Sequence, residues 1–157
     1  MYSGINEYAF QGIHAQRVVD LVSNNIFKRN IDVLTVAPIV GFQYSRTAEL
    51  DKSADYKPTK VFLAQLQAAD AKLEVNYKSI MLLDEEYEAD QEERFKKAFQ
   101  VSPENRAAAD LERYESYVRG GVDVLFEKLI GEGDTQEDRL QNLFDLVETY
   151  SNRYQLA

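Results

Sequence analysis

Residues 102–129 read SPENRAAADLERYESYVRGGVDVLFEKL, and this stretch carries the clearest helical pattern in the chain. Its apolar side chains recur at every third or fourth residue, which is the spacing of one helix face. The Ser102-Pro103-Glu104 start supplies a cap, a preset φ angle and an acid near the positive end of the helix dipole. We therefore expect one helix from Ser102 to the glycines at 131 and 133. Its buried stripe consists of Leu111, Tyr114, Val118, Val122, Leu125 and Leu129.

The residues that follow predict a second helix that runs back along the first. Asp134 and Glu137 have the spacing of a capping box, and apolar residues then recur at helical intervals as far as Tyr154. The sequence therefore predicts that Ser102–Tyr154 forms an antiparallel helical hairpin. The second helix of this hairpin is expected to bury Leu140, Leu143, Phe144, Val147, Tyr150 and Tyr154.

The first half of the chain also shows helical spacing, which predicts a helix over residues 5–27 with an irregularity near Gly12. Residues 31–44 are nearly all apolar, and they suit a buried helix kinked at Pro38 or a buried strand. We favour the helix, because the remaining sequence offers no obvious partner strand.

The middle of the chain is polar at first and then helical again. Residues 45–58 are expected to form a loop or a frayed helix end, and Thr59 is a candidate cap for the segment that follows. Residues 59–84 fit one long helix or two shorter ones. Residues 88–99 are expected to form an acidic turn that leads into Phe95, Ala98 and Phe99.

Composition agrees with a single helical domain over residues 1–157. The chain is long enough to bury a core without disulfides or metal, and 45% of its residues are hydrophobic. Seven Gly and three Pro are too few for the many tight turns of an all-β fold. The predicted fold is an all-α, irregular bundle of five to seven helices that ends in the helical hairpin.

The net charge of −9 comes from the second half of the chain. Residues 1–80 carry nine Lys and Arg against eight Asp and Glu, whereas residues 81–157 carry nine against nineteen. This balance disfavours direct nucleic-acid binding, which needs clustered cations to contact phosphates. No apolar stretch approaches the ~18 residues of a membrane span, and the lack of cysteine fits a reducing compartment. We expect a cytoplasmic protein that makes no membrane contact.

Motifs that would indicate catalysis, cofactors or metals are missing from the sequence. It has no Gly-x-Ser-x-Gly elbow and no phosphate-cradling glycine loop. Its single histidine, His14, has no Glu-x-x-His partner, and we interpret it as a partly exposed helix residue. A calcium loop that began at Asp84 would need Gly and Glu where Ala89 and Phe95 stand. We therefore expect no enzyme, no cofactor and no metal.

Two groups of residues are candidates for interaction with a protein partner. The acidic segment 84–93 is interpreted as a solvated helix end or linker, or as a docking surface for a basic partner. The second group surrounds two glycines inside a predicted helix, where the missing side chains indicate internal packing, a partner contact or a hinge. The candidate residues are Asp84, Glu85, Glu86, Glu88, Asp90, Glu92 and Glu93, together with Tyr114, Tyr117, Arg119, Gly120 and Gly121.

These features favour a non-enzymatic protein that acts by protein–protein contact, as an accessory subunit of a larger assembly or as a homo-oligomer. Apolar and tyrosine contacts would supply affinity, and the acidic half would steer basic partners. One alternative is an acidic inhibitor that mimics DNA, although interspersed arginines break up any continuous anionic stripe. The other is an enzyme with a carboxylate and tyrosine site, which would need a pocket holding His14 or several converging acids.

Overall fold

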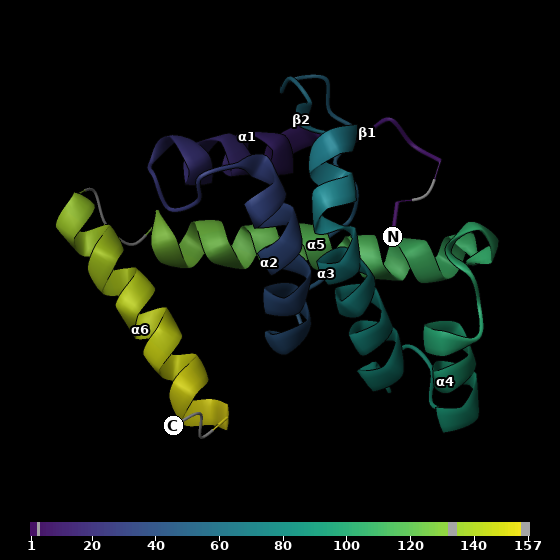
Figure 1. The fold of residues 1–157 in the computed structure, drawn as a ribbon. Coiled ribbons are helices and arrows are strands. Elements are labelled where there is room, and N and C mark those ends of the chain that lie inside the picture. Colours follow the sequence, from purple (N-terminus) through teal and green to yellow (C-terminus); the bar gives the residue numbers. More distant parts are fainter. Residues whose placement is uncertain (3, 132–134, 155–157) are drawn as a thin grey trace.

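The computed structural model describes residues 1–2, 4–131 and 135–154 (Figure 1). Within these residues the protein is mostly helical, which confirms the predicted all-α bundle, and two short strands form a small sheet. In chain order the elements are β1 (Glu7–Phe10), α1 (Gly12–Ser23), α2 (Asn30–Gln43), β2 (Thr59–Phe62), α3 (Leu63–Leu83), α4 (Gln91–Phe99), the 3-10 turn η1 (Pro103–Asn105), α5 (Ala108–Leu129) and α6 (Gln136–Tyr154).

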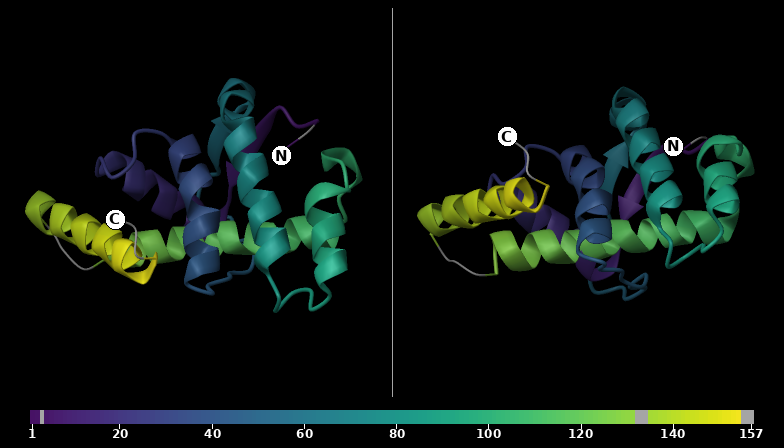
Figure 2. Two further views of the ribbon diagram at one scale, coloured as in Figure 1. Left: turned by 60° about the horizontal axis from the view of Figure 1, so that its bottom comes forward. Right: turned by 90° about the horizontal axis from the view of Figure 1, so that it is seen from below.

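The long helix α5 is the element on which the others pack. It lies across α2 and α3, and α6 folds back from its C-terminal end (Figures 1 and 2). This arrangement confirms the C-terminal helical hairpin. Most of the stripe predicted for α5 is fully buried, namely Tyr114, Val118, Val122, Leu125 and Leu129.

The predicted helix start at Ser102 is wrong, because α5 begins six residues later. Ser102 instead precedes the separate turn η1, and its hydroxyl accepts a hydrogen bond from the Asn105 side chain at 2.9 Å. Arg106 then has an extended backbone and buries its guanidinium over the Tyr77 ring, 3.9 Å from the ring centroid. We attribute the interruption to this burial, because a continuous helix would carry Arg106 in a different direction.

Helix α2 crosses α5 at a point where both backbones lack side chains. Gly41 of α2 lies against the Tyr117 carbonyl and the Gly121 amide, and Gly121 of α5 lies against the Ala37 carbonyl. A Cβ atom at either glycine would overlap these backbone atoms. The glycines therefore allow a helix crossing closer than ordinary side chains permit.

The apolar segment 31–44 is a helix, as favoured from the sequence, and Pro38 lies inside it. Ile31, Val33, Leu34 and Ala37 are all buried. A helix buried on most of its surface shows no clear apolar and polar alternation, which explains why the sequence left two interpretations open.

The predicted helix over residues 5–27 is wrong in its first part, because residues 7–10 form a strand. β1 pairs antiparallel with β2, with Glu7 opposite Phe62 and Phe10 opposite Thr59. Gly12 then begins α1 with a φ angle of +57°, and the Asp51 side chain occupies the space that a Cβ atom would need. The irregularity noted near Gly12 therefore marks a change from strand to helix.

The predicted cap at Thr59 is also wrong, because this residue begins β2. Its buried hydroxyl donates a hydrogen bond to the Ala15 carbonyl at 3.0 Å, which ties the sheet to α1. Helix α3 follows as one uninterrupted helix, which settles the choice between one and two helices. Residues 45–58 contain no helix or strand, as expected for a loop.

Helix α6 buries a different set of side chains from the one predicted. Leu146 is buried, and Leu143 and Tyr150 are partly buried against the core. The other predicted members, Leu140, Phe144 and Val147, are exposed. The Tyr154 side chain lies outside the described part of the structure.

The predicted capping box at Asp134 falls on residues that the structure does not describe, as does Gly133. Within the described residues, Thr135 and Asp138 exchange hydrogen bonds in the manner of a capping box one residue further on. The Asp138 amide donates to the Thr135 hydroxyl at 3.1 Å, and the Thr135 amide donates to the Asp138 carboxylate at 3.1 Å.

Replacing Gly121 with alanine should lower the free energy of unfolding by about 2 kcal/mol, because the new methyl group would overlap the Ala37 backbone. Alanine is otherwise the better helix former by ~1 kcal/mol. The double variant Gly120→Leu with Gly121→Leu should lower the free energy of unfolding further. Urea unfolding measures this free energy for both variants. An unchanged unfolding midpoint in the double variant would contradict the close crossing.

Candidate functional site

The acidic segment 84–93 joins α3 to α4 (Figure 1), and its carboxylates have different roles. Asp84 is buried at the C-terminal end of α3. Asp90 caps α4 by accepting hydrogen bonds from the Glu92 and Glu93 amides at 2.8 and 3.0 Å. Glu88 is half-buried. The capping Asp90 is exposed to solvent, as are Glu85, Glu86, Glu92 and Glu93.

Asp84 is a structural anchor, because its carboxylate is paired within the chain. Arg113 of α5 donates to it through Nε at 2.7 Å, and the Tyr117 hydroxyl donates at 3.0 Å. Burial and the neighbouring Asp84 raise the pKa of Tyr117 well above its ordinary value, so the phenol stays protonated and acts as the donor. Asp84 is therefore not available as a docking carboxylate, contrary to the sequence-based interpretation.

A second anchor is Arg94 of α4, which is buried beneath the acidic segment. Its guanidinium donates to the carbonyl oxygens of Leu82, Glu88 and Ala89 at 2.8–3.0 Å. Three carbonyl acceptors on one fixed side chain hold the backbone between α3 and α4 in a single conformation. Arg94 also forms an ion pair at 3.2 Å with the exposed Glu85.

Tyr87 supplies a third anchor, in the middle of the segment. Its hydroxyl donates to Asp110 of α5 at 2.8 Å, and Lys97 of α4 pairs with the same carboxylate at 2.6 Å. Burial and the bond to Asp110 raise the pKa of Tyr87 to about 12. The exposed carboxylates therefore project from a backbone that is tied to α3, α4 and α5.

Two phenylalanines extend this acidic surface along α4. Phe95 and Phe99 are 48% and 50% exposed, and their ring centroids lie 5.1 Å apart. Phe95 borders an open hollow of about 460 Å³ that Glu92 and Lys96 also line. We call Glu85, Glu86, Glu92, Glu93, Phe95 and Phe99 the acidic–aromatic surface.

The sequence did not distinguish these two rings from core residues. Phe95 and Phe99 are four residues apart, as they would be on a buried helix face. The residues that pack inward are instead Arg94 and Ala98, one position earlier in each case. Because the inward face of α4 carries an arginine where an apolar residue is usual, the sequence gives no signal that distinguishes it from the face with Phe95 and Phe99.

The second group of candidate residues lies inside the molecule. Tyr114, Tyr117, Arg119, Gly120 and Gly121 are all buried. Gly120 lies against the backbone of residues 46–47, and Arg119 donates to the Ala48 carbonyl at 2.8 Å and pairs with Glu112. The structure thus uses these residues for internal helix packing, the first of the interpretations left open by the sequence.

His14 is buried, which corrects its interpretation as a partly exposed helix residue. Its Nε2 lies 3.0 Å from the Asp123 carboxylate of α5, and Arg17 pairs with the same carboxylate. Burial acts to raise the pKa of Asp123, but the contacts with His14 and Arg17 outweigh it and hold that pKa below its usual range. This cluster joins α1 to α5.

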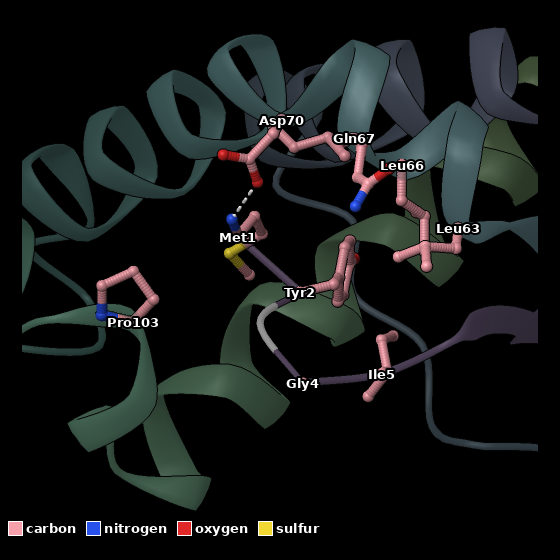
Figure 3. Close-up of a pocket in the computed structure, with 10 residues that line it drawn as sticks. Met1, Tyr2, Gly4, Ile5, Leu63, Leu66, Gln67, Asp70 and Pro103 are labelled. Carbon is pink, nitrogen blue, oxygen red and sulfur yellow. Dashed lines mark hydrogen bonds and ion pairs between the residues drawn. The ribbon is translucent and has the colours of Figure 1, made fainter.

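A pocket of about 430 Å³ lies beside the N-terminal segment (Figure 3). Leu63, Leu66 and Ile5 supply much of its apolar lining, and the Met1 amino group lies 2.5 Å from the Asp70 carboxylate. His14 does not line it, and its one lining carboxylate is already paired. The pocket therefore does not provide the converging acids that a carboxylate and tyrosine enzyme site would need.

A cluster of tyrosines and a carboxylate lies next to this pocket. The hydroxyls of Tyr2 and Tyr8 both donate to the Glu115 carboxylate at 2.7 Å. Burial raises the pKa of Glu115 despite these two donors. The cluster attaches the N-terminal segment and β1 to α5.

Comparisons with known proteins add no further assignment, since no family model, curated protein or solved structure matches the chain. In the part of the chain that the structure describes, every helix is too short or too polar to cross a membrane. The same residues contain no group of three His, Asp or Glu side chains arranged to hold a metal ion.

Neutralising the four exposed glutamates should leave the stability nearly unchanged, whereas removing the buried carboxylate of Asp84 should lower it. The quadruple variant Glu85→Gln, Glu86→Gln, Glu92→Gln and Glu93→Gln should unfold at nearly the wild-type temperature. Ion pairs of exposed glutamates contribute little, and a glutamine at position 85 still offers an oxygen acceptor to Arg94, which keeps its three carbonyl partners. Asp84→Ala should lose about 3 kcal/mol, because it leaves the Arg113 guanidinium and the Tyr117 hydroxyl without their acceptor. Thermal and urea unfolding measure both variants. A large loss in the quadruple variant would show that these acids are structural.

Asp123→Asn should destabilise the protein at pH 7 by about 3 kcal/mol, and this loss should shrink as the pH falls below the ordinary carboxyl pKa. The folded-state pKa of Asp123 is lowered. Its stabilising effect is therefore complete above the carboxyl group's ordinary pKa and is lost as the pH falls through the folded-state value. Urea unfolding of the variant and the wild type across this range measures the difference. A difference that stays constant with pH would contradict an ionised Asp123 in the His14 cluster.

Proposed function

We propose that this protein is a non-enzymatic docking protein, acting as an accessory subunit of a larger assembly. The acidic–aromatic surface is its binding site, and the partner is a protein segment that carries apolar side chains among lysines and arginines. The observation that carries the proposal is the exposed pair Phe95 and Phe99, placed beside carboxylates on a backbone fixed from inside the chain.

The chemistry of this surface supports both affinity and selectivity. Two half-exposed rings offer apolar area that a partner can bury, and aromatic anchors supply much of the binding energy at protein interfaces. The exposed glutamates would speed association with a basic partner and repel acidic ones. The anchors at Asp84, Arg94 and Tyr87 mean that little ordering is needed on binding, which lowers its entropic cost.

The net charge of −9 fits this proposal and also disfavours nucleic acid as the partner. A cytoplasmic location remains part of the proposal and rests on the lack of cysteine. The DNA-mimic alternative makes a different prediction about salt. Binding to a DNA-like surface should collapse as salt is added, whereas apolar docking on the two rings should persist.

A defined peptide pair tests the proposal directly. One helical peptide carries Leu at every third or fourth residue and Lys on the opposite face, and its counterpart has Glu in place of each Lys. The Lys peptide should bind the wild type by fluorescence anisotropy, and Phe95→Ser with Phe99→Ser should weaken binding at least tenfold, about 1.4 kcal/mol. The quadruple glutamine variant should also bind more weakly and with a flatter salt dependence.

A matched control removes two apolar side chains elsewhere, Val19→Ser on α1 and Leu50→Ser in the loop before β2, which are both exposed. This variant should bind like the wild type. Equal binding by the serine variant of the two phenylalanines would refute the proposed site. Equal binding of the Glu peptide would refute the proposed partner chemistry.

A further inference from the structure

Helix α6 has an apolar surface that the described part of its own chain leaves uncovered. Leu140, Phe144 and Val147 are 60%, 62% and 59% exposed, and their spacing places them on one face over about 10 Å of helix. On the neighbouring face, Leu146 packs against the core. The apolar surface of α6 is therefore wider than the part that the described residues cover. We call the exposed part, Leu140, Phe144 and Val147, the α6 knob face.

A shallow groove runs between α2 and α3. Two adjoining hollows of about 240 and 370 Å³ share Thr35 of α2 and Lys72 of α3. Three alanines of α3, at positions 68, 69 and 71, line these hollows, with Val36 and Val75 beside them. Small residues that line these hollows leave room for bulky side chains from another helix, as in helix-in-groove recognition.

The charges at the edges of these two surfaces are opposite. Glu137 and Glu148 lie along one edge of the knob face, because eleven residues make about three helical turns. Arg29, Asp32 and Lys72 line the groove, so its lining holds two cations and one carboxylate, and Arg29 stays 61% exposed although it pairs with Asp32. Net repulsion between two acidic chains is screened beyond about 8 Å at physiological salt. The electrostatic part of the contact therefore depends on the glutamates of the knob face and the cations of the groove, which would lie close together.

The knob face cannot occupy the groove of its own chain. In Figures 1 and 2, α6 and α3 lie on opposite sides of α2. Pairing α6 antiparallel with a second α6 about a two-fold axis would bring the edge with Glu137 and Glu148 against the same edge of the other copy. This like-charge contact disfavours a symmetric α6 pair.

We propose that the α6 knob face of one copy docks into the α2–α3 groove of a second copy. Each copy then carries one knob face and one groove, so the contact is head-to-tail. A chain of any length keeps one free knob face at one end and one free groove at the other. This assembly uses none of the acidic–aromatic surface, and the docking function proposed above stands or fails separately from it.

Two single-surface variants test the head-to-tail contact. Leu140→Ser with Phe144→Ser removes the knob face, and Ala68→Glu with Ala71→Glu fills and recharges the groove at exposed helical positions. The wild type should gain mass by sedimentation velocity as its concentration rises from about 1 to 300 µM, a range suited to weak association. Each variant alone should remain a monomer with an unchanged circular dichroism spectrum.

The decisive sample is an equimolar mixture of the two variants. One supplies an intact groove and the other an intact knob face, so the mixture should form a 1:1 dimer and nothing larger. Phe95→Ser with Phe99→Ser should leave wild-type self-association unchanged. A wild type that stays monomeric throughout, a mixture that does not dimerise, or a groove variant that still self-associates would each overturn the proposal.

Discussion

The close crossing of α2 and α5 is the constraint on which the rest of the structure depends. Gly41 and Gly121 bring the two backbones together without intervening side chains, and Gly120 brings the loop after α2 equally close. Because α2 is buried so deeply, α5 can also accept α1 on one side of the crossing and α3 on the other. Two adjacent glycines inside a helix each lower helix stability by about 1 kcal/mol relative to alanine, and this packing offsets that loss.

Buried ion pairs connect this helical core to the surface that we propose is functional. Asp84, Arg94 and Asp110 each make their contacts inside the protein, yet together they fix the position of a highly charged segment. The acidity of residues 84–93 is thus divided between two roles. Some carboxylates determine where the backbone lies, and those left exposed determine which partners it would attract.

Several sequence-based expectations failed where distant residues decided the outcome. Residues 7–10 became a strand because residues 59–62 lie beside them, and a four-residue strand has too few alternations to be recognised alone. The sequence gives no sign that His14 is buried, because its partner Asp123 is more than a hundred residues away. For Phe95 and Phe99, the helical spacing was correct, but Arg94 and Ala98 took the inward face.

The sequence by itself determined the helices, since periodic apolar residues and local breaks such as Gly12 act within a few turns of chain. It also determined the acidic second half and the C-terminal hairpin. Only the tertiary structure decided which carboxylates are buried, which side of α4 faces solvent and how much of α6 is covered. These outcomes depend on which surfaces meet when the helices pack. Helical periodicity predicts which face of a helix is apolar, but it does not predict which element packs against that face.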